Sequence, residues 1–112
     1  LVKPEKVDIF VMDADGKNTR QLTDNNKANF GPFFFPDDKR IIFSSNLNSQ
    51  TGRNFNLFKI NVDGTGLEQV TFSGGYNFFP MFSRDGKKLI FISSRNAKSQ
   101  YEFNVFIADW VD

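Results

Sequence analysis

The stretch Phe78–Ser93 reads FFPMFSRDGKKLIFIS, with an aromatic start that contains Pro80, a tight turn at Ser83–Lys87 and a closing apolar strand. A nearly identical stretch, FGPFFFPDDKRIIFSS, lies forty-eight residues earlier at Phe30–Ser45. Because the same parts recur in the same order and at a fixed spacing, the sequence contains an internal repeat. The rest of the chain can be placed relative to these two copies.

Residues 7–54 align with residues 55–102 without a gap, and fifteen positions are identical. The identities include turn formers, such as Gly16 and Gly64, and core-type residues, such as Phe43 and Phe91. A 48-residue period without a helical pattern is typical of a β-propeller, in which each blade is a small sheet that cannot bury both faces alone. We therefore predict an all-β fold with blades of four antiparallel strands and about two and a quarter repeats.

One partial propeller over residues 1–112 is expected, with repeats at 7–54 and 55–102 and the start of a third at 103–112. A polar lead-in is expected at residues 1–6. The expected strands are 7–13, 19–23, 32–35, 40–45, 55–62, 67–71, 79–83, 89–93 and 103–110. This order gives two strands, then four, then three. Unpaired edges and uncovered apolar faces are therefore expected at both ends of the array.

The strand 40–45 is apolar on both faces, as a strand between two neighbouring sheets must be. The turn before it differs between the copies, because Asp38 stands where the second copy has Gly86. A left-handed backbone at this position suits Gly better than Asp. We therefore expect the substitution Asp38→Gly to stabilise the fold.

Composition excludes several classes of function. The net charge of +1 and the scattered Lys and Arg residues argue against nucleic acid as a partner. No apolar run approaches the ~20 residues of a membrane span. The chain has no His, no Cys and no Gly-x-Ser-x-Gly motif, which excludes Ser-His-Asp catalysis and His- or Cys-based metal sites within it. We expect no enzyme activity and no cofactor.

The segment Asp13-x-Asp15-Gly16-x-Asn18 resembles the start of a calcium-binding loop. It lacks the distal Glu of such loops and lies where a hairpin turn is needed. The second copy keeps Asp63-Gly64 but loses one carboxylate. We interpret both segments as turns and expect no metal site.

The turn and strand residues resemble the repeat of TolB-type β-propellers. One matching pattern is P-x-F-S-x-D-G-K-x-L-x-F-x-S at Pro80–Ser93, and another is N-L-F-x-x-N-x-D-G at Asn56–Gly64, followed by Val70-Thr71. The resemblance covers about residues 7–110. It implies blades of four antiparallel strands around a central channel, a bacterial periplasm or cell-envelope location and a role in binding or scaffolding other proteins. In the protein that gives the family its name, the propeller contacts a peptidoglycan-associated lipoprotein.

The chain begins without Met or a signal peptide and stops after the third strand of a blade. From this we expect a C-terminal fragment of a larger propeller. A protein partner is expected, and self-association that completes a propeller is an alternative. A second hypothesis is the non-catalytic propeller cap of a prolyl oligopeptidase-type serine peptidase. A third and weaker hypothesis is part of a propeller lyase or glycan-degrading enzyme.

The loops before the innermost strands gather at one end of a propeller channel, where ligands usually bind. In this chain they are residues 24–31 and 72–79. Candidate partner-binding residues are Asn26, Lys27, Asn29, Phe30, Tyr76, Asn77 and Phe78. For the recurring Asn-Phe pairs a structural role is favoured, in which Phe fills space between blades and Asn bonds to loop backbone.

Overall fold

The fold is described from a computed structural model that covers residues 5–112, and these residues form nine β-strands and no helix. The first four residues of the expected polar lead-in lie outside the described residues. The strands are β1 (Phe10–Val11), β2 (Arg20–Gln21), β3 (Asn29–Phe34), β4 (Arg40–Ser45), β5 (Asn56–Asn61), β6 (Glu68–Gln69), β7 (Asn77–Phe82), β8 (Lys88–Ser93) and β9 (Asn104–Asp109).

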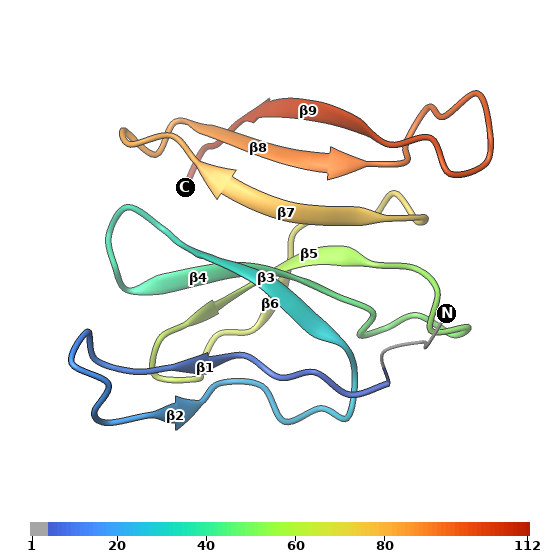
Figure 1. The fold of residues 1–112 in the computed structure, drawn as a ribbon. Coiled ribbons are helices and arrows are strands. Elements are labelled where there is room, and N and C mark those ends of the chain that lie inside the picture. Colours follow the sequence, from blue (N-terminus) through green and yellow to red (C-terminus); the bar gives the residue numbers. More distant parts are fainter. Residues whose placement is uncertain (1–4) are drawn as a thin grey trace.

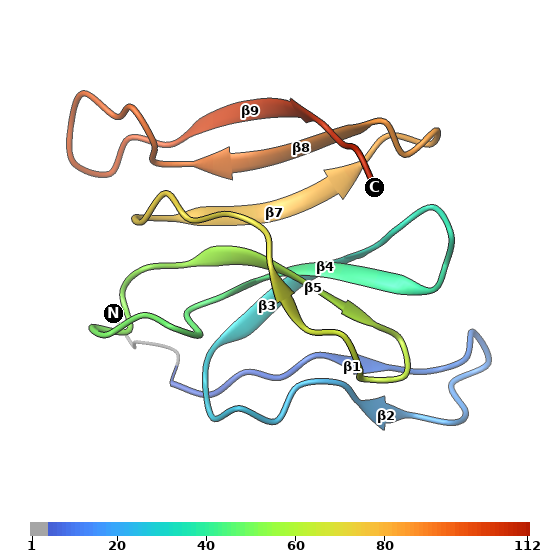
Figure 2. The ribbon, with the colours of Figure 1, turned by 180° about the vertical axis from the view of Figure 1, so that it is seen from behind.

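Three antiparallel sheets lie one above another in layers (Figures 1 and 2). They contain two strands in the order β1-β2, four in the order β3-β4-β5-β6 and three in the order β7-β8-β9. The predicted all-β fold with antiparallel sheets is confirmed. So is the grouping into two, four and three strands within the described residues.

The strand pairing repeats with the sequence period. In the four-stranded sheet Arg40 pairs with Asn61 and Ser45 with Asn56. In the three-stranded sheet, strands β8 and β9 pair in the same register, with every residue number higher by one period. Because the register is preserved, each residue of the last sheet has a structural counterpart forty-eight positions earlier.

The innermost strands begin earlier than the sequence predicted. The expected starts at residues 32 and 79 are wrong, because β3 begins at Asn29 and β7 at Asn77. A shift in register interrupts each strand, between Phe30 and Phe33 in β3 and at the equivalent place in β7. Pro32 and Pro80 lie in these bulges, where the missing N–H of proline does not break the ladder. The prolines therefore mark an irregularity inside each strand and not its beginning.

The core consists of two layers between the three sheets. One layer joins β1 and β2 to the four-stranded sheet and contains Ile41 and Phe43 of β4. The other joins the four-stranded sheet to the last one and contains Ile42 of β4. All three side chains are at most 3% exposed. Strand β4 is therefore buried on both faces, as its apolar sequence predicted.

The two ends of the stack expose apolar side chains in the described structure. On the last sheet, the face away from the core carries Met81, Ile90, Val105 and Ile107, which we call the outer face. At the other end Phe10 and Met12 are exposed, while their neighbour Ile9 is buried. This agrees with the uncovered apolar faces expected from the strand count.

The turns have the conformations that the sequence indicated. Asp38 and Gly86 both have left-handed backbones, with φ of 58° and 73°. The preceding aspartates accept a hydrogen bond from the N–H two residues on, at 2.8 Å for Asp37 and 2.9 Å for Asp85. These carboxylates stabilise local turns, which agrees with their predicted structural role.

Candidate protein-binding surface

Two of the predicted site residues, Asn29 and Asn77, are wholly buried. Each asparagine donates both its backbone N–H and its side-chain amide to the carbonyl of the first residue of its repeat. Asn29 bonds to the Val7 carbonyl at 2.9 and 3.0 Å, and Asn77 bonds to the Phe55 carbonyl at 3.0 and 3.0 Å. The two residues therefore lie at the starts of strands and fasten each sheet to the segment before it. They are not in loops, as the sequence reading had placed them.

A serine completes each of these contacts. The hydroxyl of Ser45 donates to Asn29 Oδ1 at 2.7 Å, and that of Ser93 donates to Asn77 Oδ1 at 2.9 Å. The amide nitrogen and the amide oxygen of each asparagine both have hydrogen-bond partners within the chain. The burial of these side chains therefore needs no ligand to satisfy them. The structure thus supports the structural role favoured for these asparagines.

The aromatic candidates Phe30, Tyr76 and Phe78 do come together. The ring centroids are 5.5 Å apart for Phe30 and Phe78 and 5.6 Å apart for Tyr76 and Phe78. These are distances at which aromatic rings attract one another. Three further rings join the group, and we call the six the aromatic surface: Phe30, Phe55, Tyr76, Phe78, Phe79 and Phe103. It lies where β3, β7 and β9 begin, toward the right of Figure 1.

Two rings of the aromatic surface are open to solvent, since Phe79 is 53% and Phe103 is 41% exposed. Phe79 has a positive φ of 53°, which is unusual for a bulky side chain and costs conformational energy. Its ring lies over Gly31, where a Cβ atom would come within 3.2 Å of Phe79 Cδ1. The bulge of β7 thus holds an exposed aromatic ring against the glycine of the neighbouring bulge.

The remaining candidates, Asn26 and Lys27, lie in the loop before β3. Asn26 is exposed, and the carbonyl of Lys27 accepts a hydrogen bond from the N–H of Val7 at 3.1 Å. Their loop is one repeat away from the loop that carries Tyr76. The structure therefore divides the seven predicted residues into two asparagines that fasten sheets, an aromatic group and one separate polar loop.

Sequence reasoning missed part of this end of the molecule. Phe55, Phe79 and Phe103 were assigned to strands or to the general core. A polar pocket also lies at this end, lined by Asn48, Ser49, Gln50, Thr51, Asn54, Asn56, Phe72 and Gly74. The recurrence of Phe55 and Phe103 at equivalent positions was the available signal for the aromatic group, whereas the pocket depends on how two loops fold together.

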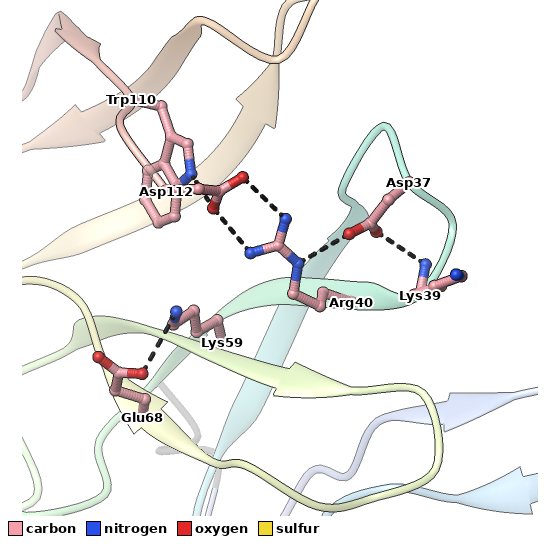
Figure 3. Close-up of polar contacts among 7 residues, drawn as sticks. All are labelled: Asp37, Lys39, Arg40, Lys59, Glu68, Trp110 and Asp112. Carbon is pink, nitrogen blue, oxygen red and sulfur yellow. Dashed lines mark hydrogen bonds and ion pairs between the residues drawn. The ribbon is translucent and has the colours of Figure 1, made fainter.

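A group of ionic contacts centred on Arg40 lies where β4 begins, at the opposite end of the sheets (Figure 3). The Arg40 guanidinium bonds to Asp37 at 2.9 Å and to both carboxylate oxygens of Asp112 at 2.8 and 3.1 Å. Trp110 also donates to Asp112, at 2.9 Å. Hydrogen bonds from Arg40, and then from Trp110, lower the pKa of Asp112 below its usual range, and the same contact raises the pKa of Arg40.

This ionic group connects neighbouring sheets. Arg40 begins β4, while Trp110 and Asp112 follow β9. The Trp110 ring also packs edge-on against Phe35 and Phe82, with centroids 5.3 and 5.2 Å away. Every member has a partner within the chain, so the group is explained as a structural contact between two repeats.

The calcium-like segment forms the expected hairpin. The Gly16 N–H donates to the Asp13 carbonyl at 2.9 Å, and the Asp15 carboxylate accepts from the Lys17 N–H at 2.9 Å. Among residues 5–112, no group of three or more acidic, His or Cys side chains is placed to hold a metal ion. The same residues include no helix long and apolar enough to cross a membrane.

β-Propellers repeat a four-stranded antiparallel sheet around a central channel, and β3-β4-β5-β6 is one such sheet, with its register repeated in β8 and β9. Residues 1–110 match the family model described as the TolB beta propeller domain. The chain therefore belongs to the TolB β-propeller family. A comparison with curated protein sequences found no match.

The first of two similar solved structures agrees with this assignment. The chain is 32% identical to a putative TolB from Agrobacterium tumefaciens, with a TM-score of 0.74, and the match covers 91% of this chain and 37% of that one. It is 17% identical to TolB from Acinetobacter baumannii, with a TM-score of 0.45 and coverage of 95% and 36%. The chain thus spans little more than a third of the length of these proteins. The match to TolB does not favour the peptidase-cap hypothesis.

Proposed function

We propose that this chain is a non-catalytic protein-binding module of the bacterial cell envelope, and that a protein partner binds at the aromatic surface. Membership of the TolB propeller family supports the proposal, because the family is generally non-catalytic. TolB homologues are periplasmic, which supports the envelope location by family resemblance. The expected partner class is protein, and the first candidate is a peptidoglycan-associated lipoprotein.

The observation that carries the proposal is the exposure of Phe79 and Phe103 within a packed aromatic group. Aromatic side chains are enriched where proteins bind one another, because they bury a large apolar area with little loss of side-chain freedom. The neighbouring polar pocket adds amide and hydroxyl groups that can orient a partner. An apolar centre with a polar border is the usual composition of such an interface.

The test is a calorimetric titration of the chain with the peptidoglycan-associated lipoprotein of the source bacterium. We expect Phe79→Ala and Phe103→Ala to weaken binding by about tenfold or more each, as removal of central aromatic residues does. Phe34→Ala is the matched control, because Phe34 is 46% exposed but lies at the other end of β3. Absence of binding by the unchanged chain, or equal affinity of all three variants, would overturn the proposal.

A second copy of the chain is the alternative partner. The outer face of the last sheet is apolar, and an apolar pocket lies beside β3, between Phe34 and the exposed Met12, which follows β1. Packing of the last sheet of one copy against this pocket would cover both surfaces. Light scattering after size exclusion measures the mass: a discrete oligomer supports self-association, and a well-folded monomer at high concentration overturns it.

A further inference from the structure

The polar pocket lies between two loops of the middle sheet, the loop that joins β4 to β5 and the loop that joins β6 to β7. Both loops lie toward the right of Figure 1, at the end where β5 and β7 begin. The pocket has a volume of about 340 Å³. This volume is within the range of sites that hold small molecules.

Hydrogen bonds fix the walls of the pocket. The Gly75 N–H donates to Asn54 Oδ1 at 3.2 Å, which connects the two loops. The Asn54 N–H donates to Ser49 Oγ at 3.1 Å, and the Asn48 amide donates to Gln69 Oε1 at 3.2 Å. Because these contacts already hold the loops in place, a ligand would not have to order them, and the entropic cost of binding is reduced.

Asn56 lines the pocket and carries a buried donor that has no acceptor. The side chain is only 9% exposed. Its Oδ1 accepts hydrogen bonds from the Thr71 hydroxyl at 2.9 Å and from the Asn77 amide at 3.2 Å. Among residues 5–112 its Nδ2 donates to no group. Buried amide nitrogens normally have an acceptor, and a molecule in the pocket can supply one here.

The fold itself does not need this amide nitrogen. In the first repeat the position of Asn56 is occupied by Asp8, whose carboxylate accepts the equivalent threonine hydroxyl at 2.9 Å and has no nitrogen. In the last sheet the counterpart is Asn104, and its amide nitrogen donates to Glu102 at 3.1 Å. The middle sheet has Asn54 in place of Glu102. The acceptor that the last repeat supplies from within is therefore missing from this part of the described structure.

An aromatic ring forms another part of the pocket. Phe72 lines it and is 75% exposed. The first repeat has Asp24 at this position, so the repeat does not require an aromatic side chain there. Such a ring offers an apolar face beside the amide and hydroxyl groups of the loops.

The pocket is also uncharged. Within the described residues, no side chain that lines it is ionisable. A charged ligand would therefore lose its hydration without gaining a partner of opposite charge. The equivalent loop of the last sheet differs, because it has Lys98 where the pocket has Gln50. The pocket thus favours a neutral ligand with many polar groups and one apolar face.

We propose that the pocket binds a neutral saccharide. A sugar hydroxyl both donates and accepts hydrogen bonds, as carboxamide and hydroxyl side chains together do. The C–H face of one pyranose ring packs on Phe72, and a sugar oxygen accepts the hydrogen bond from Asn56 Nδ2. This ligand is additional to the proposed protein partner, and its site is the pocket and not the aromatic surface.

The test is an NMR titration of the ¹⁵N-labelled chain with three neutral probes: maltotriose, cellotriose and the trimer of N-acetylglucosamine. We expect at least one of them to bind saturably with a Kd on the order of 1 mM or lower. The side-chain amide signal of Asn56 should shift with the same Kd. That of Asn29 should stay in place, because its amide nitrogen already has acceptors inside the chain.

Variants of Phe72 test the contact with the sugar ring. Phe72→Ala should weaken binding of the best probe by at least about tenfold, whereas Phe72→Trp should preserve it. Phe34→Ala is the matched control, because Phe34 is also exposed but lies at the other end of β3. Circular dichroism checks that each variant is folded.

Retention of the chain on insoluble starch, cellulose or chitin identifies the source of the saccharide. Retention that the matching trisaccharide competes away supports the proposal with a polymer as the ligand. Binding of the trisaccharide without retention supports it with a free oligosaccharide.

The proposal is overturned if none of the three probes shifts the Asn56 amide at about 10 mM, tenfold above the expected Kd. Equal affinity of Phe72→Ala and the unchanged chain would also overturn it, as would unsaturable shifts spread over the surface. The titration contains no protein partner, so its failure leaves the proposed protein binding untouched. Phe79→Ala should bind the saccharide as the unchanged chain does.

Discussion

The sheets β3–β6 and β7–β9 have the same register and similar sequences, yet they bury their side chains very differently. Ile42 of the four-stranded sheet is fully buried, whereas its counterpart Ile90 in the last sheet is 37% exposed. Leu57 and its counterpart Val105 differ even more, at 0% and 63%. The four-stranded sheet packs against another sheet on each of its faces, whereas the last sheet packs against another sheet on one face only.

This difference shows that the repeat determines which face a side chain occupies, while the neighbouring sheet determines whether that face is buried. Ile42 and Ile90 are identical residues at equivalent positions, so their intrinsic preferences cancel. What remains is the contribution of the sheet packed against them. The outer face of the last sheet is therefore one place where the described residues leave apolar surface uncovered.

The largest expected effect comes from the isoleucine pair. Ile42→Ala should lower the free energy of unfolding by about 2–5 kcal/mol, because it removes a fully buried side chain between two sheets. Ile90→Ala should lower it by no more than about 1 kcal/mol, since its side chain keeps contact with water. Urea unfolding of both variants measures the difference, and equal losses would contradict the stated burial.

The buried asparagines should behave alike in both copies. Asn29→Ala and Asn77→Ala each remove the acceptor of a buried serine hydroxyl, Ser45 or Ser93, and one of the two hydrogen bonds to a backbone carbonyl, which should cost about 1–3 kcal/mol. Asn104→Ala in β9 is the control and should have little effect, because Asn104 is exposed and its backbone is not left-handed. Urea unfolding of the three variants checks this, and a large difference between Asn29 and Asn77 would show that they do not share one structural role.

The two turns should respond in opposite directions. Asp38→Gly should stabilise the chain by about 0.5–1 kcal/mol, because Gly adopts the left-handed conformation without steric cost. Gly86→Asp should destabilise it, since φ is 73° and a Cβ atom would lie 3.1 Å from Pro36 Cγ. Thermal melting of both variants tests this pair. A lower melting temperature for Asp38→Gly would contradict the turn assignment.

The smallest expected effect is on pH dependence. Hydrogen bonds from the Lys39 and Lys87 backbone lower the pKa of Asp37 and of Asp85. A carboxyl group whose pKa is lower in the folded state stabilises the fold above its unfolded pKa of about 3.9, and this is lost as the pH falls through the folded value. Stability should therefore decrease below about pH 4. For Asp37→Asn and for Asp85→Asn, the free energy of unfolding should fall slightly less between pH 6 and pH 2 than it does for the unchanged chain. Urea unfolding at each pH measures this fall, and an equal fall in all three proteins would contradict the lowered pKa values.

Much of this architecture could be predicted from the sequence because the repeat is visible in it. The apolar run Ile41-Ile42-Phe43 indicated a strand covered on both sides, and Asp38 against Gly86 indicated a left-handed turn. The strand starts were misplaced, since proline within a bulge has the same sequence signature as proline at a strand end. The positive φ of Phe79 had no local signal either, because it depends on the space that Gly31 leaves in the neighbouring strand.

The candidate site was predicted less completely for the same kind of reason. The repeat identified Phe30 and Phe78, but the wider aromatic surface depends on how Phe55, Phe79 and Phe103 converge from other strands. Asn29 and Asn77 recur because they fasten sheets together. Recurrence alone does not distinguish a structural residue from a binding residue, and burial in the structure provides that distinction.

The most direct test of the account compares amide hydrogen exchange at Leu57 and Val105, measured by NMR on the unchanged chain. The N–H of Leu57 is covered by the Thr71 hydroxyl and the outer strand β6, whereas that of Val105 lies on the open edge of β9. We expect Val105 to exchange at least about a hundredfold faster, as amides at open edges do. Equal protection at the two positions would show that the last sheet is covered, and it would contradict the account.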